Sequence, residues 1–187
     1  MLAEIPPTGV DAAPAEVGVS RRRYVLAFPC SYELCEGQTP LTNSAASATY
    51  VCAAFQRIGF HAAVHSNLCA ARIVGVVTGA AQALLSNDVL VLYFCCHGFV
   101  DKSRATGHER QYVVTEDGKH VDVADICAVV SQGVTNKNLN NVTLLTLLDC
   151  CRSARSRTSV ASLLNGHCFR MLTSLLTHQA QPSCCIV

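Results

Sequence analysis

Short runs of apolar residues, separated by segments of helical periodicity, dominate the chain. The clearest run, VLVLYFCC at 89–96, is apolar at every position, which is typical of a parallel strand covered on both faces. Similar runs predict further strands at 24–28, 60–66 and 142–149. Apolar residues that recur every three or four positions predict helices at 43–59, 69–85, 124–134 and 159–178.

The segment QYVVTEDGKHVDV, at 111–123, predicts a hairpin of two short strands, because Asp117 and Gly118 form a dipeptide that favours tight turns. Elsewhere strands and helices alternate along the chain. We therefore predict an α/β fold, a three-layer sandwich whose short, mainly parallel sheet is flanked by helices. Residues 1–20 are rich in Ala, Pro, Gly and Val without any period, and we expect a flexible leader there.

The composition is that of a globular protein with a large core. The chain has 187 residues, of which 50% are hydrophobic and 14% charged, so it can form one well-packed domain. A net charge of +1 argues against nucleic acid as a partner, and the three arginines at 21–23 predict only a solvated positive edge. No apolar run reaches the roughly 18 residues of a membrane span, and the N-terminal residues lack a signal-peptide pattern. These features predict a cytoplasmic location.

Twelve cysteines raise the question of disulfides and metal binding. Many lie inside apolar segments, where a free cysteine behaves as a small hydrophobic residue, so we expect reduced thiols. The adjacent pairs, at 95–96, 150–151 and 184–185, lack the C-x2-C spacing of a zinc site, and no metal site is predicted. The segment that begins at Cys184 matches the C-a-a-X prenylation pattern, with coincidence in a cysteine-rich chain as the alternative. Membrane association is expected only if Cys184 is lipidated.

Two predicted strands end in residues with reactive side chains. The first runs into His97 and Gly98. The second ends at Asp149 and continues with Cys150 and Cys151. Because the carboxyl ends of neighbouring parallel strands meet at the same edge of a sheet, we expect an imidazole and a thiol to lie close together there. A thiol becomes a good nucleophile when a base favours the thiolate, and a glycine lets its backbone N–H approach a substrate carbonyl.

This arrangement resembles the caspase, metacaspase and paracaspase group of cysteine peptidases. A strand followed by His-Gly, and 54 residues later a strand followed by Asp-x-Cys-Arg, matches the group in order and spacing. Asp149 stands where caspases have glutamine, so the resemblance is closer to the metacaspase and paracaspase branch. Two further segments, FQRIGFHAAVH and YVVTEDGKHVDVADI, are similar to the group, and the resemblance covers roughly residues 22–155.

The resemblance implies a role for each of these residues. Cys151 matches the nucleophile and His97 the catalytic histidine. The backbone N–H groups of Gly98 and Cys151 match the oxyanion hole. Asp149 matches an acid that binds Arg or Lys before the scissile bond by ion pairing, and Cys150 is only the neighbour of the nucleophile. Some relatives need calcium, although the sequence places no calcium site.

The chain also departs from the group's pattern. Ser47 stands where a second acid of the substrate site is usual, and the segment DKSRATGHER, at 101–110, is mixed in charge rather than acidic. We expect residues 21–158 to form a large-subunit domain, followed by a helix and tail at 159–187, without the small-subunit half.

Two functions remain open at this point. One is a cysteine endopeptidase that acts on protein or peptide substrates. The other is a catalytically weak or inactive protein that regulates a full-length relative, pairing with it or with another copy through an uncapped sheet edge. Another chain could also supply the missing half.

Overall fold

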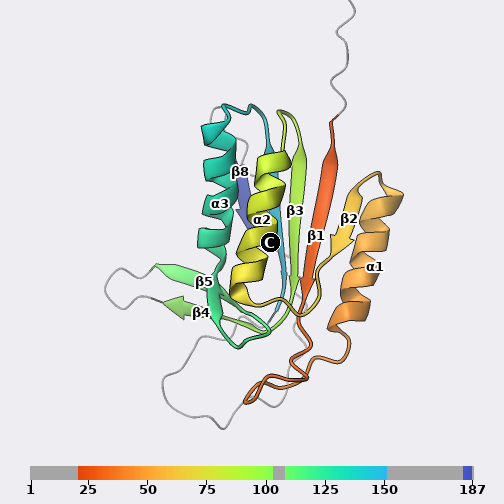
Figure 1. Cartoon of the computed structure of the whole chain (residues 1–187), viewed down its shortest axis with the longest axis vertical. Helices are drawn as coiled ribbons and strands as arrows, with labels where there is room; N and C mark the ends of the chain where they lie inside the picture. Colours follow the sequence, from red (N-terminus) through yellow and green to blue (C-terminus); the bar gives the residue numbers. More distant parts are fainter. Residues whose placement is uncertain (1–20, 103–107, 151–182, 187) are drawn as a thin grey trace, which may run out of the picture.

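A parallel sheet of five strands lies at the centre of the computed structural model, which describes residues 21–102, 108–150 and 183–186 (Figure 1). Each strand pairs in parallel with the next. Across the sheet the order is β2 (His61–Val64), β1 (Arg23–Pro29), β3 (Val89–Cys95), β7 (Thr143–Asp149) and β8 (Ser183–Ile186). The prediction of a short, mainly parallel sheet is confirmed.

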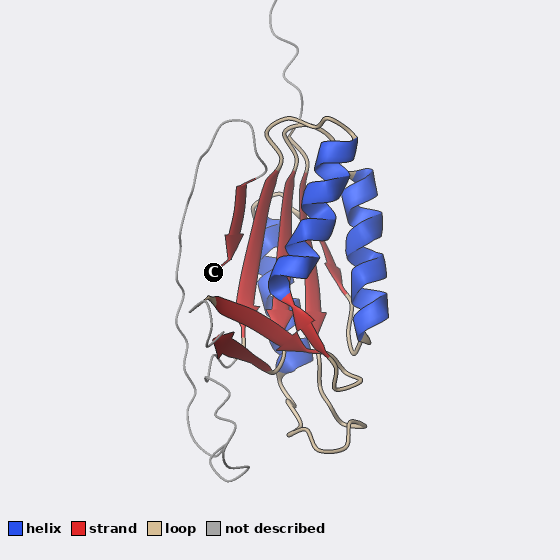
Figure 2. Ribbon diagram, turned by 90° about the vertical axis from the view of Figure 1, so that its left-hand side faces the viewer, coloured by secondary structure: helices blue, strands red, loops and turns tan. Residues whose placement is uncertain are grey.

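Helices cover both faces of this sheet, as Figure 2 shows. On one face lies α1 (Ser44–Arg57), and on the other lie α2 (Ala70–Ala83) and α3 (Val123–Asn136), which pack against each other. All three helices were expected from their apolar periodicity, and their ends agree with the predicted ranges to within two residues. The predicted helix at 159–178 and the leader at 1–20 lie outside the described residues.

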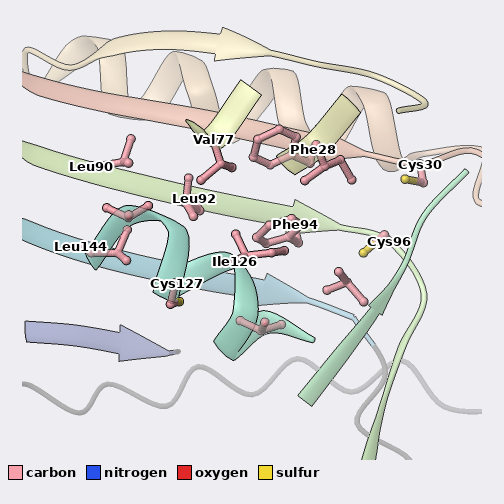
Figure 3. Packing of buried hydrophobic residues seen from close by; sticks show 14 of the residues in the cluster. Phe28, Cys30, Val77, Leu90, Leu92, Phe94, Cys96, Ile126, Cys127 and Leu144 are labelled. Carbon is pink, nitrogen blue, oxygen red and sulfur yellow. The ribbon is translucent and has the colours of Figure 1, made fainter. Parts of the chain in front are cut away.

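Alternation along β3 divides the core into two clusters, because successive side chains of a strand point to opposite faces. Leu90, Leu92 and Phe94 pack against α2 and α3, as Figure 3 shows for Val77 and Ile126. The intervening residues face the α1 side, and they are Val91, Tyr93 and Cys95. A strand buried on both faces explains why the run at 89–96 is apolar throughout.

A second, antiparallel sheet follows the end of β3. It has the order β4 (Gly98–Lys102), β5 (Glu109–Val114) and β6 (His120–Asp122). The turn between β5 and β6 contains Gly118 with a φ of +69°, which confirms the predicted hairpin. The hydrophobic pattern does not predict β4, because GFVDK is short, half polar and leaves the main sheet to pair with β5.

Residues 183–186 form β8, where the sequence predicts only a tail. Their backbone pairs with residues 143–146 of β7, so β7 is not an edge strand. Among the described residues, β8 is then the outermost strand on this side of the sheet. The pairing of this protein with another chain stays a prediction.

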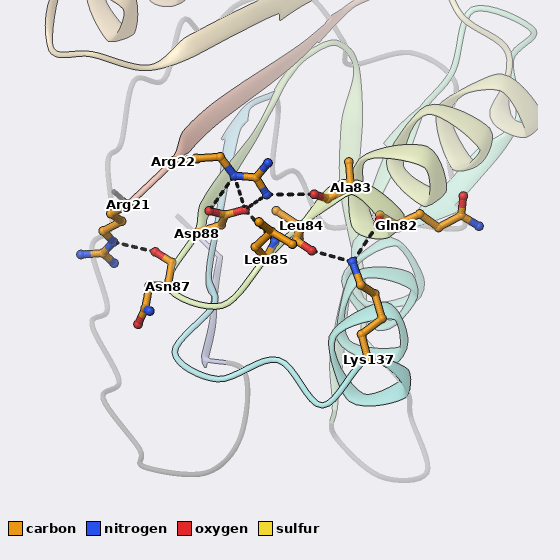
Figure 4. A network of polar contacts seen from close by, with 9 residues as sticks. All are labelled: Arg21, Arg22, Gln82, Ala83, Leu84, Leu85, Asn87, Asp88 and Lys137. Atoms are coloured by element: carbon orange, nitrogen blue, oxygen red, sulfur yellow. Dashed lines mark hydrogen bonds and ion pairs between the residues drawn. The ribbon is translucent and has the colours of Figure 1, made fainter. Parts of the chain in front are cut away.

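A network of polar contacts closes the amino-terminal end of the sheet (Figure 4). The Arg22 guanidinium donates to both carboxylate oxygens of Asp88, which is 1% exposed, and to the carbonyl of Ala83 at 2.9 Å. Lys137 donates to the carbonyls of Gln82 and Leu84, at 2.8 and 2.6 Å. The expectation of a merely solvated edge at 21–23 is thus wrong for Arg22.

In the ranges that the structure describes, no helix is both long enough and apolar enough to cross a membrane.

Candidate active site

The carboxyl ends of β3 and β7 lie side by side. Cys95 and Asp149 are register partners, and the Cys96 N–H extends the ladder by donating to the Asp149 carbonyl at 3.4 Å. His97 and Cys150 are the next residues of the two segments. The expectation that the two strand ends lie together is therefore confirmed, and we call this carboxyl-terminal end of the sheet, from Cys95 to Gly98 and at Asp149 and Cys150, the rim. Cys151 lies outside the described residues, one peptide bond beyond Cys150.

His97 is held on two sides. Its Nε2 lies 2.7 Å from the carbonyl oxygen of Thr39, in the loop between β1 and α1. Its ring stacks on Tyr32, with the centroids 4.7 Å apart and the planes at 25°. A carbonyl oxygen can only accept, so Nε2 carries the proton, and in the neutral imidazole Nδ1 is then the acceptor. The Thr39 contact thus selects the tautomer whose Nδ1 can take up a proton.

Tyr32 joins three segments beneath His97. Its hydroxyl donates to the Val114 carbonyl at 2.5 Å and accepts the His97 N–H at 2.9 Å, while its own N–H donates to Glu116 at 3.1 Å. Burial at 1% exposure raises the pKa of Tyr32, so the phenol keeps its proton. Its φ of +58° is unfavourable for a side chain of this size, and these bonds hold the backbone there.

Gly98 begins β4 in close contact with the end of β7. A Cβ at this position would lie 2.7 Å from the Cys150 Sγ and 2.8 Å from the Tyr112 carbonyl oxygen, both well below a normal contact. Only glycine allows the two segments to approach so closely. Access of a substrate carbonyl to the Gly98 N–H is one reason for a glycine at this position, and this packing is a second.

Asp149 is exposed at the rim, on the α1 face of the sheet. Its Oδ2 accepts the Tyr93 hydroxyl at 2.8 Å and faces the Cys95 Sγ at 3.6 Å. Burial, followed by the charge of Asp149, raises the pKa of the Cys95 thiol to about 11. Burial likewise raises the pKa of Tyr93. Both groups therefore keep their protons at neutral pH and can donate to the carboxylate.

The other cysteines near the rim are buried in apolar surroundings. Burial raises the pKa of Cys30 to about 12 and that of Cys96 well above its ordinary value. Such thiols are poor nucleophiles at neutral pH. Cys150 is half-buried and packs against the larger core cluster, with its Sγ 3.9 Å from Gln111 Nε2. The eight cysteines that lie between residues 21 and 150 are free thiols.

The structure brings together most of the predicted site residues. His97, Gly98 and Asp149 meet at one rim, with Cys150 between them, whereas Cys151 and the side chain of Cys184 lie outside the described residues. Ser47 lies in the first turn of α1 and is half-buried. Within the described ranges, no three His, Cys, Asp or Glu side chains gather as a metal site would require.

Four contacts of the rim were not predicted, and they involve Tyr32, Thr39, Tyr93 and Cys95. The last two could have been found, since alternation along β3 and its pairing with β7 place them on the same face as Asp149. Tyr32 and Thr39 lie in a loop with no periodic pattern, and no sequence signal points to them.

The chain is similar to known proteins both in sequence and in fold. A family model described as the caspase domain, of the peptidase C14 family, matches residues 22–179. Among solved structures, 245 chains match, including protein GSU0716 from Geobacter sulfurreducens, with a TM-score of 0.56 and 19% sequence identity. That match covers 71% of this chain and 52% of the other, so this chain spans about half of its length. Among curated proteins, none matches significantly.

Proposed function

Because the chain belongs to the caspase-domain family, we propose that it is a cysteine endopeptidase of the metacaspase and paracaspase kind, with Cys151 as nucleophile and His97 as base. The observation that carries the proposal is the fixed imidazole at the end of β3, beside the end of β7 that leads into residue 151. The side chain of Cys150 contacts the Gly98 position. Cys151 is the next residue, and consecutive Cα atoms are about 3.8 Å apart. This short connection supports the pairing of His97 with Cys151.

The proposed reaction follows from the tautomer of His97. Its Nδ1 takes the proton of the Cys151 thiol, and the thiolate attacks the scissile carbonyl carbon to form a tetrahedral intermediate. The N–H groups of Gly98 and Cys151 donate to the oxyanion. Collapse gives a thioester, and the leaving amine takes the proton from the imidazolium. Water, deprotonated by His97, then attacks the thioester and releases the acid product. Throughout, Nε2–H donates a hydrogen bond to the Thr39 carbonyl oxygen, which stabilises the imidazolium.

Asp149 supports a preference for Arg or Lys before the scissile bond. Its carboxylate is exposed on the same rim as His97, where it can form an ion pair with a basic side chain. The described residues do not fit a calcium site, since no cluster of acidic ligands is present among them, and no step above uses calcium.

Peptidase activity can be tested with fluorogenic peptides ending in Arg, Lys or Asp, with and without calcium. We expect turnover after Arg and Lys, a loss of at least about 10³-fold in Cys151→Ala, and near-normal turnover in the matched variant Cys150→Ala. Iodoacetamide labelling adds a second readout. Cys151 should react at neutral pH, whereas Cys30 and Cys95, with pKa values of about 12 and 11, should not.

Absence of turnover by folded wild-type protein would contradict the proposal. That result would favour the other function expected from the sequence, an inactive regulator that binds a full-length relative. Equal turnover in Cys151→Ala and wild type would instead exclude Cys151 as the nucleophile.

A further inference from the structure

Three polar side chains meet on the α1 face of the sheet. Tyr93 and Cys95 come from alternate positions of β3, and Asp149 is the register partner of Cys95 on β7. The first two are 5% and 7% exposed, whereas Asp149 is exposed to solvent. The acid proposed to bind the substrate is therefore contacted from the protein side by two buried donors.

These donors act on only one of the two carboxylate oxygens. Oδ2 accepts the Tyr93 hydroxyl at 2.8 Å, and the Cys95 thiol lies 3.6 Å from the same atom. A carboxylate oxygen has two lone pairs, so these contacts use the accepting capacity of Oδ2. Within the described ranges, Oδ1 has no protein donor. One oxygen of Asp149 is thus engaged and the other remains for a ligand.

The Tyr93 contact is difficult to displace. A buried hydroxyl needs a partner, and Asp149 is the acceptor that the structure provides for this one. The raised pKa of Tyr93 keeps the proton on the phenol. A ligand that needed Oδ2 would have to compete with this bond, and it would leave the Tyr93 hydroxyl without its acceptor.

The two basic side chains place different demands on a carboxylate. The arginine guanidinium forms its strongest pairs in the bidentate mode, with two parallel N–H bonds to the two oxygens. A lysine ammonium is a point charge that one oxygen can bind. Ser47, at the position of the usual second acid, supplies no further carboxylate.

We propose that Tyr93, assisted by Cys95, is a specificity-determining residue that leaves only Oδ1 of Asp149 for the substrate and so favours lysine over arginine before the scissile bond. The inference rests on the proposed peptidase function and on the role of Asp149 in it. Tyr93 acts through Asp149 and is a positioning residue rather than a catalytic one. Removal of the Tyr93 hydroxyl should change the ratio of kcat/KM for the Arg and Lys substrates by a larger factor than it changes kcat/KM for either substrate alone.

The test compares matched fluorogenic peptides that end in Lys or Arg. Wild type should have the larger kcat/KM for the Lys peptide. Tyr93→Phe frees Oδ2 and should raise the ratio of kcat/KM for the Arg peptide to that for the Lys peptide by about 10- to 100-fold, the value of one hydrogen bond to a charged group. Cys95→Ala, which removes the longer contact, should shift the ratio in the same direction by less. Tyr32→Phe is the matched control, because it disturbs His97 and should lower both rates without changing the ratio.

Binding separates this inference from the proposed function. The affinities of the same peptides, measured by calorimetry with Cys151→Ala and with Tyr93→Phe in the Cys151→Ala background, report the preference without any turnover. Loss of the Lys preference on Tyr93→Phe supports the inference even if wild type has no activity. An unchanged ratio in folded Tyr93→Phe, or a wild-type preference for Arg, would overturn the inference while leaving the peptidase function intact.

Discussion

The two ends of the parallel sheet each carry an acid beside β3, and the two acids are used in opposite ways. At the amino-terminal end, Asp88 is 1% exposed, and both its oxygens accept bonds from Arg22, with a further bond from the Leu85 N–H at 2.7 Å. At the carboxyl end, Asp149 is exposed, and only its Oδ2 accepts protein donors among the described residues. An acid whose bonds are complete stabilises the fold, whereas one with an unused oxygen can bind a ligand.

The basic groups show the same contrast. Arg22 and Lys137 at the amino-terminal end donate to a carboxylate and to backbone carbonyls, which closes that end of the sheet (Figure 4). His97 at the other end uses Nε2 for the Thr39 carbonyl and keeps Nδ1 as an acceptor. The same three strands thus build a structural end and the proposed chemical end, and the difference lies in how fully the polar groups of the described residues are paired.

The largest effect is expected at the chemical end. His97→Ala removes the proposed base and should lower kcat/KM by about 10²- to 10⁴-fold. The free energy of unfolding should change only slightly, because the ring is only partly buried. Steady-state kinetics and denaturant unfolding of the same samples measure both effects.

His65→Ala is a matched control for that variant. The His65 ring also stacks on an aromatic side chain, with its centroid 5.8 Å from that of Phe28, and it follows β2 at the same end of the sheet. The His65→Ala variant should retain normal turnover. If His65→Ala and His97→Ala lose activity equally, the loss reflects packing, and the assignment of His97 as the base fails.

The next effect tests the contact between the two strand ends. Gly98→Ala places a methyl group 2.7 Å from the Cys150 Sγ, so β4 and the end of β7 must separate. Such overpacking should cost about 1–3 kcal/mol of unfolding free energy, and misplacing the nucleophile should lower kcat about 10²-fold.

A second substitution sharpens this prediction. Cys150→Ala in the Gly98→Ala background removes the Sγ but leaves the Tyr112 carbonyl 2.8 Å from the new methyl group. Activity and stability should therefore recover in part. Full activity in the single variant would mean that the two segments can move apart without affecting the site.

The parts of this structure that were predictable from the sequence are those governed by local patterns. The apolar run at 89–96 and the periodicity of 43–59 and 69–85 predict elements correctly, because burial on a strand or helix face repeats at a constant spacing. The placement of His97 and Asp149 at the same end of the sheet also follows, since they stand at the carboxyl ends of two apolar strands of one parallel sheet.

Contacts between distant residues could not be predicted in this way. The His97 ring contacts Thr39, 58 positions away, and the Tyr32 hydroxyl binds a carbonyl 82 positions away, both from a loop without periodicity. The same limit applies to β4, which pairs with β5 in the antiparallel sheet rather than with the main sheet. These interactions are set by tertiary geometry, which no local pattern records.

Arg22 illustrates that limit at the structural end, where the smallest change in activity is expected. Its partner Asp88 is 66 positions away, so the arginine run alone suggested nothing more than solvated charge. Asp88→Asn keeps the shape of the side chain but loses the ion pair. It should lower the free energy of unfolding by about 1–3 kcal/mol at pH 7 and leave kcat/KM unchanged.

The pH dependence of that variant separates an ion pair from simple packing. Burial raises the pKa of Asp88, but the bonds from Arg22 and the Leu85 N–H outweigh it and hold the pKa below the ordinary 3.8. The carboxylate therefore contributes stability above pH 3.8, and this contribution is lost as the pH falls through the lower, folded-state pKa. The stability difference between wild type and Asp88→Asn should shrink below about pH 4. A difference that is constant from pH 7 to pH 3 would show that Asp88 acts through shape alone, and the contrast between a fully paired end and a reactive end would then lose its electrostatic basis.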